Sequence, residues 1–266
     1  NISKLRRLGF VVMDPASGRL TGKDYGVGRF PDTSDIIDKF INEIEVNQDL
    51  AGKRFLITAG GTREAIDDVR FISNRSSGNQ GLALANLASS RGAEVTLISA
   101  NIAPEKLQKL HGIKVISVVN TEDLQRTLAD EFPNCDVLIM AAAVSDAKPI
   151  NQGGKVKKEN YQELKLVPTP DLLAEIAKNR TSQLLIGFAA EEKANLLSEG
   201  QRKLAQKGLD LIYANDILEG SIFGSDQTSG LLIDNASVTE ITLMSKEQLA
   251  YILLDKVAKR LNSSNV

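Results

Sequence analysis

A segment of roughly eighteen residues, 60–77, holds the side chains with the clearest chemical potential. Arginine recognises phosphate and carboxylate because its planar guanidinium forms two parallel, charge-assisted hydrogen bonds. Asn74 can donate and accept hydrogen bonds at once, which suits a carboxylate or a developing oxyanion. The segment therefore predicts an anion site, and a solvated loop with local ion pairs is the alternative. Its arginines are Arg63, Arg70 and Arg75, and the phosphate-loop candidates are Gly60, Gly61, Thr62, Ser76, Ser77 and Gly78.

Two stretches of small residues follow apolar runs. Ala141, Ala142 and Ala143 come after one run, and residues 187–191 end a later one. In an open parallel sheet, ligands bind beyond the carboxyl ends of the strands, where small residues let a base or sugar approach the backbone. A purely structural alanine run is the alternative, and Phe188 either stacks on a base or packs in the core.

Two groups of lysines lie farther along the chain. Lysine clusters are usually solvated faces, but beside an arginine-rich segment they indicate a polyphosphate ligand. Asp146 and Asp216 are then candidates for holding a divalent ion or a ribose. The first lysine group is Lys155, Lys157 and Lys158, and the second is Lys203 and Lys207, one helical turn apart.

The single histidine and the single cysteine limit the chemistry. With only His111, which is expected in a surface loop, a Ser-His-Asp triad, a Cys-His pair and a His-rich metal site are disfavoured. Cys135 can form neither an internal disulfide nor a cysteine metal cluster, and is expected to be buried or at the edge of the core. Catalysis must therefore rely on phosphate-binding loops, lysines, arginines and carboxylates.

The composition is that of an ordinary globular protein. The chain has 266 residues, 42% of them hydrophobic and 25% charged, with a formal net charge of -2. The length indicates one or two domains, and the charge implies no nucleic-acid partner. Its apolar runs fall short of the roughly 20 residues that a membrane helix needs, so no membrane partner is expected. With no internal disulfide and no signal peptide, a cytoplasmic location is the default.

The segments that must position these residues alternate along the chain: short apolar runs are separated by stretches with the periodicity of amphipathic helices. This alternation predicts an α/β fold, a Rossmann-like doubly wound parallel sheet with helices on both faces. Residues 147–168 predict a flexible lysine flap that returns as a strand, and residues 231–243 predict a C-terminal hairpin before a helix at 246–261. The expected strands are 54–59, 94–99, 113–118, 136–142, 184–189 and 210–214, and the expected helices between them are near 78–91, 121–132, 170–179 and 192–207.

The first crossover resembles a nucleotide-binding unit without carrying a dinucleotide fingerprint. A Rossmann loop passes from strand to helix within a few residues, whereas here residues 60–77 intervene. The acidic residue that should hold an adenosine ribose is also missing, since residues 99–101 read Ser-Ala-Asn. An NAD(P)- or flavin-dependent oxidoreductase is therefore disfavoured, and a non-catalytic nucleotide-binding module remains a further alternative.

Seven ordered motifs resemble phosphopantothenoylcysteine synthetase, over about residues 51–250. The first fifty residues resemble the end of the flavin-dependent decarboxylase that bacteria often fuse upstream, which implies domains at 1–50 (tail and linker) and 51–266 (synthetase). On that view the chain is a fragment of a longer protein. The motifs are ITAGGT at 57–62, VRFISNRSSG at 69–78, AAAVSD at 141–146, KVKK at 155–158, PTPD at 168–171, GFAAE at 187–191 and DLIYAND at 210–216.

The resemblance implies a ligase of coenzyme A biosynthesis. The family joins 4'-phosphopantothenate to L-cysteine through an acyl-nucleotide, usually an acyl-cytidylate made from CTP, and releases pyrophosphate and CMP. A divalent ion, Mg²⁺ or Mn²⁺, assists, and no flavin is expected in this part. The family also implies a homodimer whose interface lies near the acyl-binding site.

Site roles follow from the resemblance motif by motif. Arg70 and Asn74 would hold the phosphopantothenate carboxylate and the acyl intermediate, and Lys155 would stabilise charge on the α-phosphate. No metal ligands are assigned. The implied nucleotide contacts are Ala141, Ala142, Ala143, Asp146, Lys155, Pro170, Asp171, Leu172, Leu173, Phe188, Lys203 and Lys207.

Some positions depart from the family pattern. Asn79 stands where the family commonly has Lys, and Lys148 and Thr169 stand where Arg and Asn are frequent, which leaves the choice between CTP and ATP open. The segment LTGKDYGVGR at 20–29 resembles a decarboxylase motif that normally carries a catalytic cysteine where this chain has Gly22. Either that decarboxylase half is inactive or unusual, or the residue has been altered.

Overall fold

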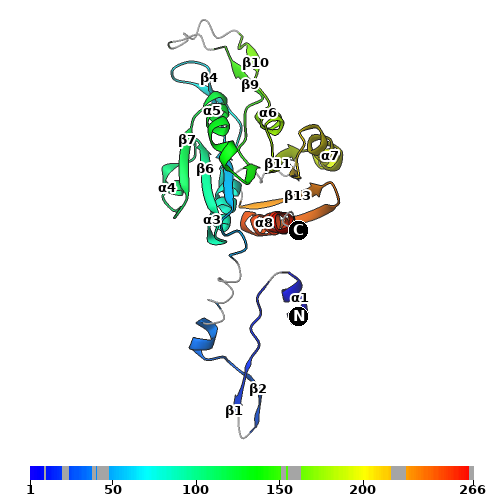
Figure 1. Ribbon diagram of the computed structural model, residues 1–266. Coiled ribbons are helices and arrows are strands. Elements are labelled where there is room, and N and C mark those ends of the chain that lie inside the picture. The colour runs from blue at the N-terminus through cyan, green and yellow to red at the C-terminus, as the bar shows by residue number, and fades with distance from the viewer. Residues whose placement is uncertain are drawn as a thin grey trace. The chain divides into compact units, whose positions relative to one another are not determined.

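The computed structural model of the chain describes residues 1–8, 10–19, 24–37, 40, 48–150, 154, 163–216 and 226–263. The chain divides into two compact units, Asn1–Asp49 and Leu50–Val266 (Figure 1). In the described part of the first unit, helix α1 (Ile2–Arg7) precedes strands β1 (Ala16–Arg19) and β2 (Tyr25–Arg29), which pair antiparallel. Gly22 lies outside the described residues.

An eight-stranded sheet forms the centre of the second unit. Its strand order is β14-β13-β12-β11-β8-β3-β6-β7, and the six strands from β12 to β7 run parallel. Numbered in chain order, these six follow the arrangement 3-2-1-4-5-6 of the Rossmann fold, which confirms the predicted fold class. The parallel strands are β3 (Arg54–Gly60), β6 (Glu94–Ala100), β7 (Lys114–Val118), β8 (Val137–Met140), β11 (Leu184–Glu191) and β12 (Leu211–Asp216).

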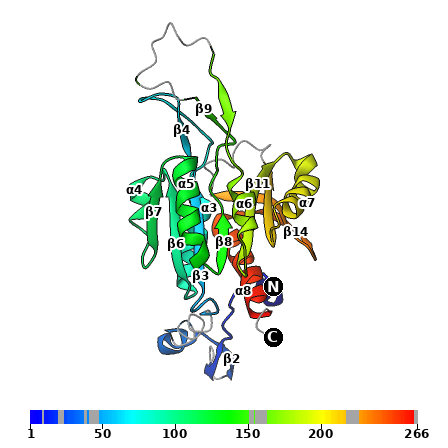
Figure 2. The same ribbon diagram turned by 45° about the horizontal axis from the view of Figure 1, so that its top comes forward.

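Helices cover both faces of this sheet (Figure 2). Helices α3 (Asn79–Ser90) and α8 (Lys246–Ser263) pack on one face, and α4 (Pro104–Leu107) adds Leu107 to the same side. Helices α5 (Thr121–Glu131), α6 (Leu172–Lys178) and α7 (Leu196–Gln206) cover the other face. Two short 3-10 helices, η1 (Phe132–Asn134) and η3 (Lys193–Asn195), precede β8 and α7.

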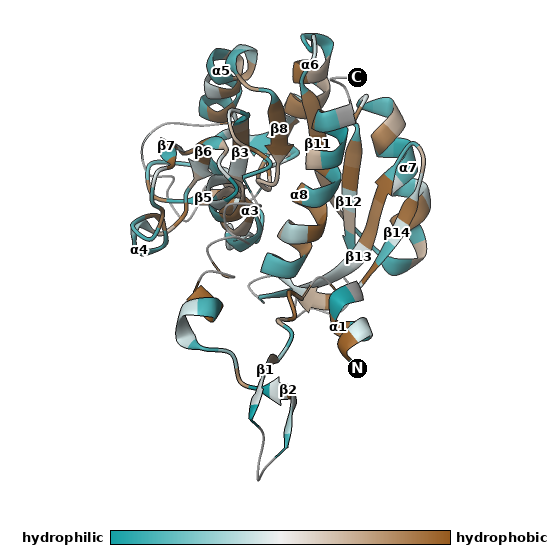
Figure 3. Cartoon of the chain, turned by 60° about the horizontal axis from the view of Figure 1, so that its bottom comes forward, coloured by the Kyte–Doolittle hydropathy of each residue, from teal (hydrophilic) through white to brown (hydrophobic). Residues whose placement is uncertain are grey.

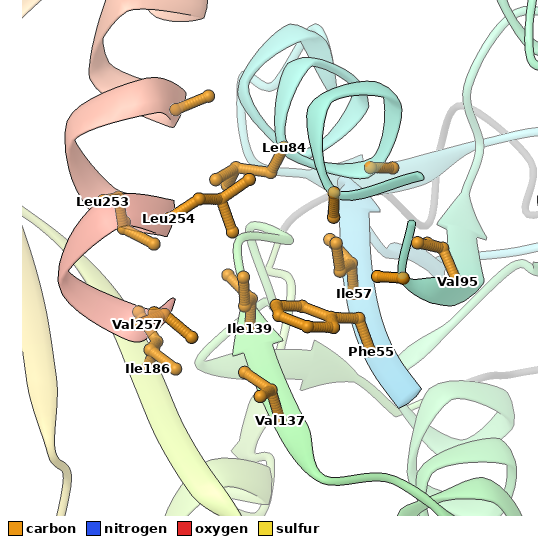
Figure 4. Close-up of a cluster of buried hydrophobic side chains, with 14 of the residues drawn as sticks. Phe55, Ile57, Leu84, Val95, Val137, Ile139, Ile186, Leu253, Leu254 and Val257 are labelled. Atoms are coloured by element: carbon orange, nitrogen blue, oxygen red, sulfur yellow. The ribbon is translucent and has the colours of Figure 1, made fainter. Parts of the chain in front are cut away.

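The alternation of side chains along β3 explains the two cores. Phe55 and Ile57 face α3 and α8 (Figure 4). Leu56 faces α5 and the helices beside it. All four residues of β8 are buried, as expected for a parallel strand covered on both sides. The same strand is brown in the hydropathy colouring of Figure 3, while the helices carry teal on their outer surfaces.

Several element boundaries differ from the predictions. Strand β8 ends at Met140, before the alanines, and α7 begins at Leu196 because residues 193–195 form a 3-10 turn. The predicted return strand exists as β10 (Leu166–Pro168), which pairs antiparallel with β9 (Ala147–Pro149). The predicted loop 60–77 contains a two-stranded hairpin, β4 (Arg63–Ala65) and β5 (Phe71–Ser73). No helix in the described ranges is long and apolar enough to cross a membrane.

The predicted C-terminal hairpin is confirmed and extends the sheet. Strands β13 (Gln227–Asp234) and β14 (Val238–Ser245) pair antiparallel, and β13 also pairs antiparallel with β12. Asp234 closes their turn by accepting hydrogen bonds of 2.8 Å from the N–H groups of Ala236 and Ser237. It also accepts a hydrogen bond of 3.0 Å from Lys256 on α8, so one carboxylate ties the turn to the helix.

We expect Asp234→Asn to lower the free energy of unfolding by about 1.5–3 kcal/mol, the usual contribution of hydrogen bonds to a charged group. Burial opposes ionisation of Asp234, but the hydrogen bonds outweigh it and lower its pKa from 3.8 to about 2. A depressed pKa stabilises the fold above its unfolded value, and this contribution is lost as the pH falls from about 4 through about 2. Urea unfolding at pH 7 and pH 3 measures both effects, and a loss of equal size at the two pH values would contradict the assignment.

Candidate functional site

A pocket of about 450 Å³ lies at the carboxyl ends of the central parallel strands. Its walls come from the segment after β8, from the ends of β11 and β12, and from the loop that leads into α3. Between β3 and β8 the strand order reverses, which is where open α/β sheets bind ligands. The pocket therefore lies where the fold favours a binding site.

The residues that follow β3 form one support of the pocket. The Gly61 N–H donates to the carbonyl of Ala100 over 3.0 Å, and Asn101 Nδ2 donates to the carbonyl of Gly61 over 2.9 Å. Thr62 is fully buried and its Oγ1 accepts the N–H of Ser145 over 3.1 Å. The predicted phosphate-loop residues 60–62 thus support the neighbouring loop and do not line the pocket.

The alanine segment after β8 is held by hydrogen bonds to its backbone. The Ala142 N–H donates to Thr58 Oγ1 over 3.0 Å, and the Ala143 N–H donates to the carbonyl of Gly60 over 2.8 Å. Asn74 Nδ2 donates to the carbonyl of Val144 over 3.0 Å. Small side chains here leave room above a backbone that is fixed from both sides, and Ala141, Ala142, Ala143 and Asp146 all line the pocket.

The N-terminus of α3 forms another wall. Ser76, Ser77 and Gly78 line the pocket, and Gly78, which has no side chain, is the N-cap of the helix. A Cβ on Gly81 would lie only 2.4 Å from Ala59 Cβ, so the glycine lets α3 pack closely on β3. Backbone N–H groups at a helix N-terminus, together with the helix dipole, favour an anion.

The predicted lysines of α7 reach the pocket, and each is paired with a carboxylate. Lys203 forms an ion pair with Glu191, and Lys207 lies 2.8 Å from Asp171. Partial burial opposes ionisation of Asp171, but its bonds to Lys207 and to the Ala174 N–H hold its pKa below the usual range. Asp171 is also the N-cap of α6 and Lys207 is the C-cap of α7, so this pair joins the ends of two helices at the pocket wall.

Two aromatic side chains line the pocket, Phe188 and Tyr213. Phe188 and Tyr213 meet edge to face, with ring centroids 5.7 Å apart. The Tyr213 hydroxyl lies 2.8 Å from Thr228 Oγ1, and burial raises the pKa of this tyrosine to about 12. Phe188 is only partly buried, packs against the core and lines the pocket. Its packing in the core is thus confirmed, and stacking on a base stays a prediction.

The predicted anion-binding arginines separate in space. Arg75 lines the pocket, whereas Arg63 lies over the Phe71 ring, 4.6 Å from its centroid. Arg70 forms an ion pair with Asp67, whose carboxylate is fully buried and also accepts the N–H groups of Val69 and Arg70. Arg70 keeps 39% of its side chain exposed on the β4–β5 hairpin, outside the pocket wall.

Other predicted residues fall in different places. Pro170, Asp171, Leu172 and Leu173 line the pocket, whereas Asp216 is buried at the end of β12 and does not. Within the described ranges, no group of three His, Cys, Asp or Glu side chains could hold a metal ion. Cys135 is buried, and burial raises the pKa of its thiol to about 12. Lys155, Lys157 and Lys158 lie outside the described residues.

Sequence reasoning missed several residues of the pocket wall. Lys246 and Thr228 come from the C-terminal hairpin and helix, and no local motif marks them. The predicted C-terminal hairpin was the available signal. Placing it antiparallel beside β12 in the Rossmann sheet would have brought this segment near the pocket. The missed residues are Met140, Val144, Ser145, Thr169, Tyr213, Asn215, Thr228 and Lys246.

The side chain of Ser145 allows the pocket wall to be tested by a stability measurement on the ligand-free protein. Its Oγ is buried, and no described residue lies within hydrogen-bonding distance of it. A buried polar atom without a partner costs roughly 1–3 kcal/mol, so Ser145→Ala should leave stability unchanged or raise it by up to about 1 kcal/mol. Thermal unfolding of the ligand-free protein measures this, with Ser73→Ala, which loses a hydrogen bond of 2.8 Å to the carbonyl of Thr62, as the destabilised control. A clear loss of stability in Ser145→Ala would reveal a partner for this hydroxyl.

Comparison with known proteins places this geometry in a family. The family model described as "DNA/pantothenate metabolism flavoprotein C-terminal domain" matches residues 50–261. The chain belongs to this family. A crystal structure of the C-terminal domain of the coenzyme A biosynthesis bifunctional protein CoaBC is 33% identical to the chain. The aligned region covers 81% of this chain and 99% of that structure's chain, and the TM-score is 0.67.

Curated relatives in this family are longer than the chain. The CoaBC protein of Mycobacterium bovis is 39% identical over 274 residues, which cover 97% of this chain and 65% of the relative. The CoaBC protein of Bacillus subtilis is 35% identical over 266 residues, with 97% and 64% covered. The chain therefore spans slightly less than two thirds of the length of these two relatives.

Proposed function

We propose that the chain is a ligase of coenzyme A biosynthesis that joins 4'-phosphopantothenate to L-cysteine. Its membership of the flavoprotein C-terminal domain family and its likeness to the CoaBC C-terminal domain support this activity. One observation carries the proposal furthest. A single pocket combines a small-residue loop, a helix N-terminus with paired serines and two lysine–carboxylate pairs, which is a suitable environment for a nucleoside triphosphate.

The proposed reaction has two steps. A carboxylate oxygen of phosphopantothenate attacks the α-phosphorus of CTP, and the bond from that phosphorus to the bridging oxygen breaks, so pyrophosphate leaves. The cysteine amine then attacks the acyl carbon of the acyl-cytidylate, CMP leaves with the bonding electrons, and the amine loses a proton. Such chemistry needs positioning and charge neutralisation, and it requires no histidine or cysteine nucleophile.

The residues take separate parts in this proposal. The backbone from Ala141 to Ala143 and the ring of Phe188 hold the base and sugar, and Lys203 and Lys207 add positive charge near the phosphates. Asn74, anchored on the Val144 carbonyl, is close enough to this loop to orient the acyl group. Arg70, whose guanidinium is oriented by its ion pair with Asp67, binds the carboxylate of phosphopantothenate. Lys155 neutralises charge on the α-phosphate of the nucleotide.

We propose that Mg²⁺, or Mn²⁺ in its place, binds together with the nucleotide. Magnesium is usually bound by one or two carboxylates together with substrate phosphates, so a preformed cage of three acidic residues is not required. Asp146 is exposed and lines the pocket, which fits this donor set. When bound, the ion would neutralise phosphate charge and orient the triphosphate, and Asp146 would supply the protein oxygen.

Further parts of the proposal concern the whole protein. The bifunctional relatives support a fused decarboxylase domain, to which residues 1–50 would belong as tail and linker, with no flavin bound by the present chain. We also propose a homodimer with its interface near the acyl-binding site, and a cytoplasmic location. No nucleic acid or membrane partner is proposed.

The deciding experiment is pyrophosphate release, run with CTP and with ATP in parallel. We expect release that depends on phosphopantothenate, and 4'-phosphopantothenoylcysteine once cysteine is added, with CTP the better nucleotide. Nucleotide binding without turnover would favour a non-catalytic module instead. A flavin absorbance spectrum in the purified chain, or reduction of NAD(P), would favour an oxidoreductase.

Asn74→Asp should separate the two half-reactions. If Asn74 orients the acyl-cytidylate for attack by cysteine, the second step is lost while the first continues. We expect the rate of product formation to fall by about 10²-fold or more, the usual cost of removing one transition-state hydrogen-bond donor, with a smaller loss of pyrophosphate release. Mass spectrometry of quenched reactions measures both species, and equal losses would remove Asn74 from this role.

A further inference from the structure

Lys246 joins the pocket from the far end of the chain. It is the first residue of α8, directly after β14, and it lines the pocket although only 8% of the residue is exposed. Helix α8 lies beside α3 on the same face of the sheet (Figure 4). Lysine is rarely buried to this extent without a specific reason. Because Lys246 also lines the pocket, its charge is available to an anion bound there.

The backbone of Lys246 is attached to the first turn of α3. Its N–H donates to the carbonyl of Asp226 over 2.9 Å, and its carbonyl accepts Gln80 Nε2 over 3.2 Å. Asn79 Nδ2 donates to Asp226 Oδ1 over 2.9 Å. These contacts hold the start of α8 against the N-terminus of α3, so the position of Lys246 in the pocket wall is fixed.

Positive charge accumulates at this end of the pocket. Lys106 Nζ donates to the carbonyl of Ser77 over 3.1 Å and to Asn79 Oδ1, so a second ammonium lies at the α3 N-terminus. Burial lowers the pKa of Lys246, the carboxylate of Asp226 opposes this, and the charge of Lys106 adds to it. Glu247 acts in the same direction as Asp226. An anion bound here would gain from two cations and from the helix dipole.

We propose that Lys246 binds a phosphate group of a substrate at the α3 end of the pocket. The inference rests on the proposed function for the identity of that substrate. Two sources share the chemistry, the terminal phosphates of the nucleoside triphosphate and the phosphomonoester of phosphopantothenate. Lys106 acts as a positioning residue, because its ammonium holds the Ser77 carbonyl and the Asn79 side chain in place.

Calorimetric binding to Lys246→Met tests the proposal and separates the two sources. Methionine keeps an unbranched apolar stem one atom shorter than that of lysine and removes the charge. A hydrogen bond to a charged group contributes about 1.5–3 kcal/mol, so binding of CTP and inorganic tripolyphosphate, or else of phosphopantothenate, should weaken by about 10- to 100-fold. Binding of pantothenate, which lacks the phosphate, should not change. Lys259→Met, on an exposed position of α8, is the matched control and should bind all of these compounds normally.

Stability distinguishes this role from a structural one. Because burial disfavours the charged lysine, Lys246→Met should unfold at the same temperature as the parent chain or above it, while binding phosphate more weakly. A variant with normal affinity for CTP, tripolyphosphate and phosphopantothenate overturns the proposal. Since binding is measured without turnover, a failure of the ligation assay would reject the proposed function and leave this test standing.

A titration of the parent chain decides the matter if the methionine variant does not fold. In protein with ¹³C-labelled lysine, the Lys246 signal is identified by its absence in Lys246→Arg. Tripolyphosphate or phosphopantothenate should raise the pKa of this lysine, because a bound anion favours the ammonium form. An unchanged pKa with both ligands at saturation overturns the proposal.

Discussion

Replacing Gly60 by alanine should lower the free energy of unfolding by roughly 2–6 kcal/mol. Gly60 ends β3 with a φ of 90°, where an L side chain is strained by about 1–3 kcal/mol. A Cβ here would also lie 2.0 Å from the carbonyl oxygen of Ala100 and 2.9 Å from Ile102 Cγ1. Overpacking of this kind adds about 1–3 kcal/mol, because the nearest atom belongs to the backbone of β6 and cannot move alone.

Gly52→Ala is the matched control for Gly60→Ala. Gly52 has a φ of 71°, and no described atom lies within 4 Å of where its Cβ would be, so only the backbone strain applies. We expect Gly52→Ala to lower the free energy of unfolding by about 1–2 kcal/mol. Guanidinium unfolding of both variants gives the comparison, and equal losses would show that β3 and β6 separate easily. Because Gly60 also supports Ala143, nucleotide binding should weaken in Gly60→Ala and stay normal in Gly52→Ala.

Lys155→Gln should lower kcat for nucleotidyl transfer by about 10²- to 10³-fold without changing the unfolding temperature. A cation that contacts the α-phosphate in the transition state contributes on this scale. The lysines of α7 give the contrast. Lys203 and Lys207 are each paired with a carboxylate, so part of their charge is already neutralised. For Lys203→Gln and Lys207→Gln we expect a rise in KM for CTP of about tenfold, the size of a single hydrogen bond to a charged group, and little change in kcat.

Steady-state kinetics with CTP as the varied substrate measures these effects. Lys165→Gln is the control, because Lys165 is exposed just before β10 and does not line the pocket. It should turn over at the normal rate. Near-normal kcat in Lys155→Gln would remove that lysine from the chemical step. A loss of kcat in Lys203→Gln as large as in Lys155→Gln would show that α7 takes part in it.

The sequence carried enough information for the parallel sheet because its strands are buried on both faces. Continuous apolar runs such as 55–57 and 137–140 mark these strands, and amphipathic helices separate them. The residues that the family resemblance implies for nucleotide binding were also brought together. All eleven implied nucleotide contacts other than Lys155 line one pocket. Their chemical roles remain predictions.

The residues that sequence reasoning missed depend on tertiary contacts. The β4–β5 hairpin has three-residue strands with mixed polar and apolar side chains, so no period of two is visible. Within its turn, the buried carboxylate of Asp67 accepts the N–H groups of Val69 and Arg70, a tertiary detail that no local pattern marks. Lys246 follows a strand that carries no nucleotide motif. The antiparallel pairing of β14 with β13 and of β13 with β12, together with its contacts to Asp226 and Gln80, brings it to the pocket.

The position of α8 has a consequence for the newly made chain. Synthesis runs from the N-terminus, so α3 and the strands around it leave the ribosome long before α8 does. Until α8 arrives, the side of the sheet that carries Ile139 and Ile186 lacks part of its cover, and the pocket lacks Lys246. We therefore expect nascent chains that stop before residue 246 to aggregate or bind chaperones, and we expect tight substrate affinity only in chains that include α8.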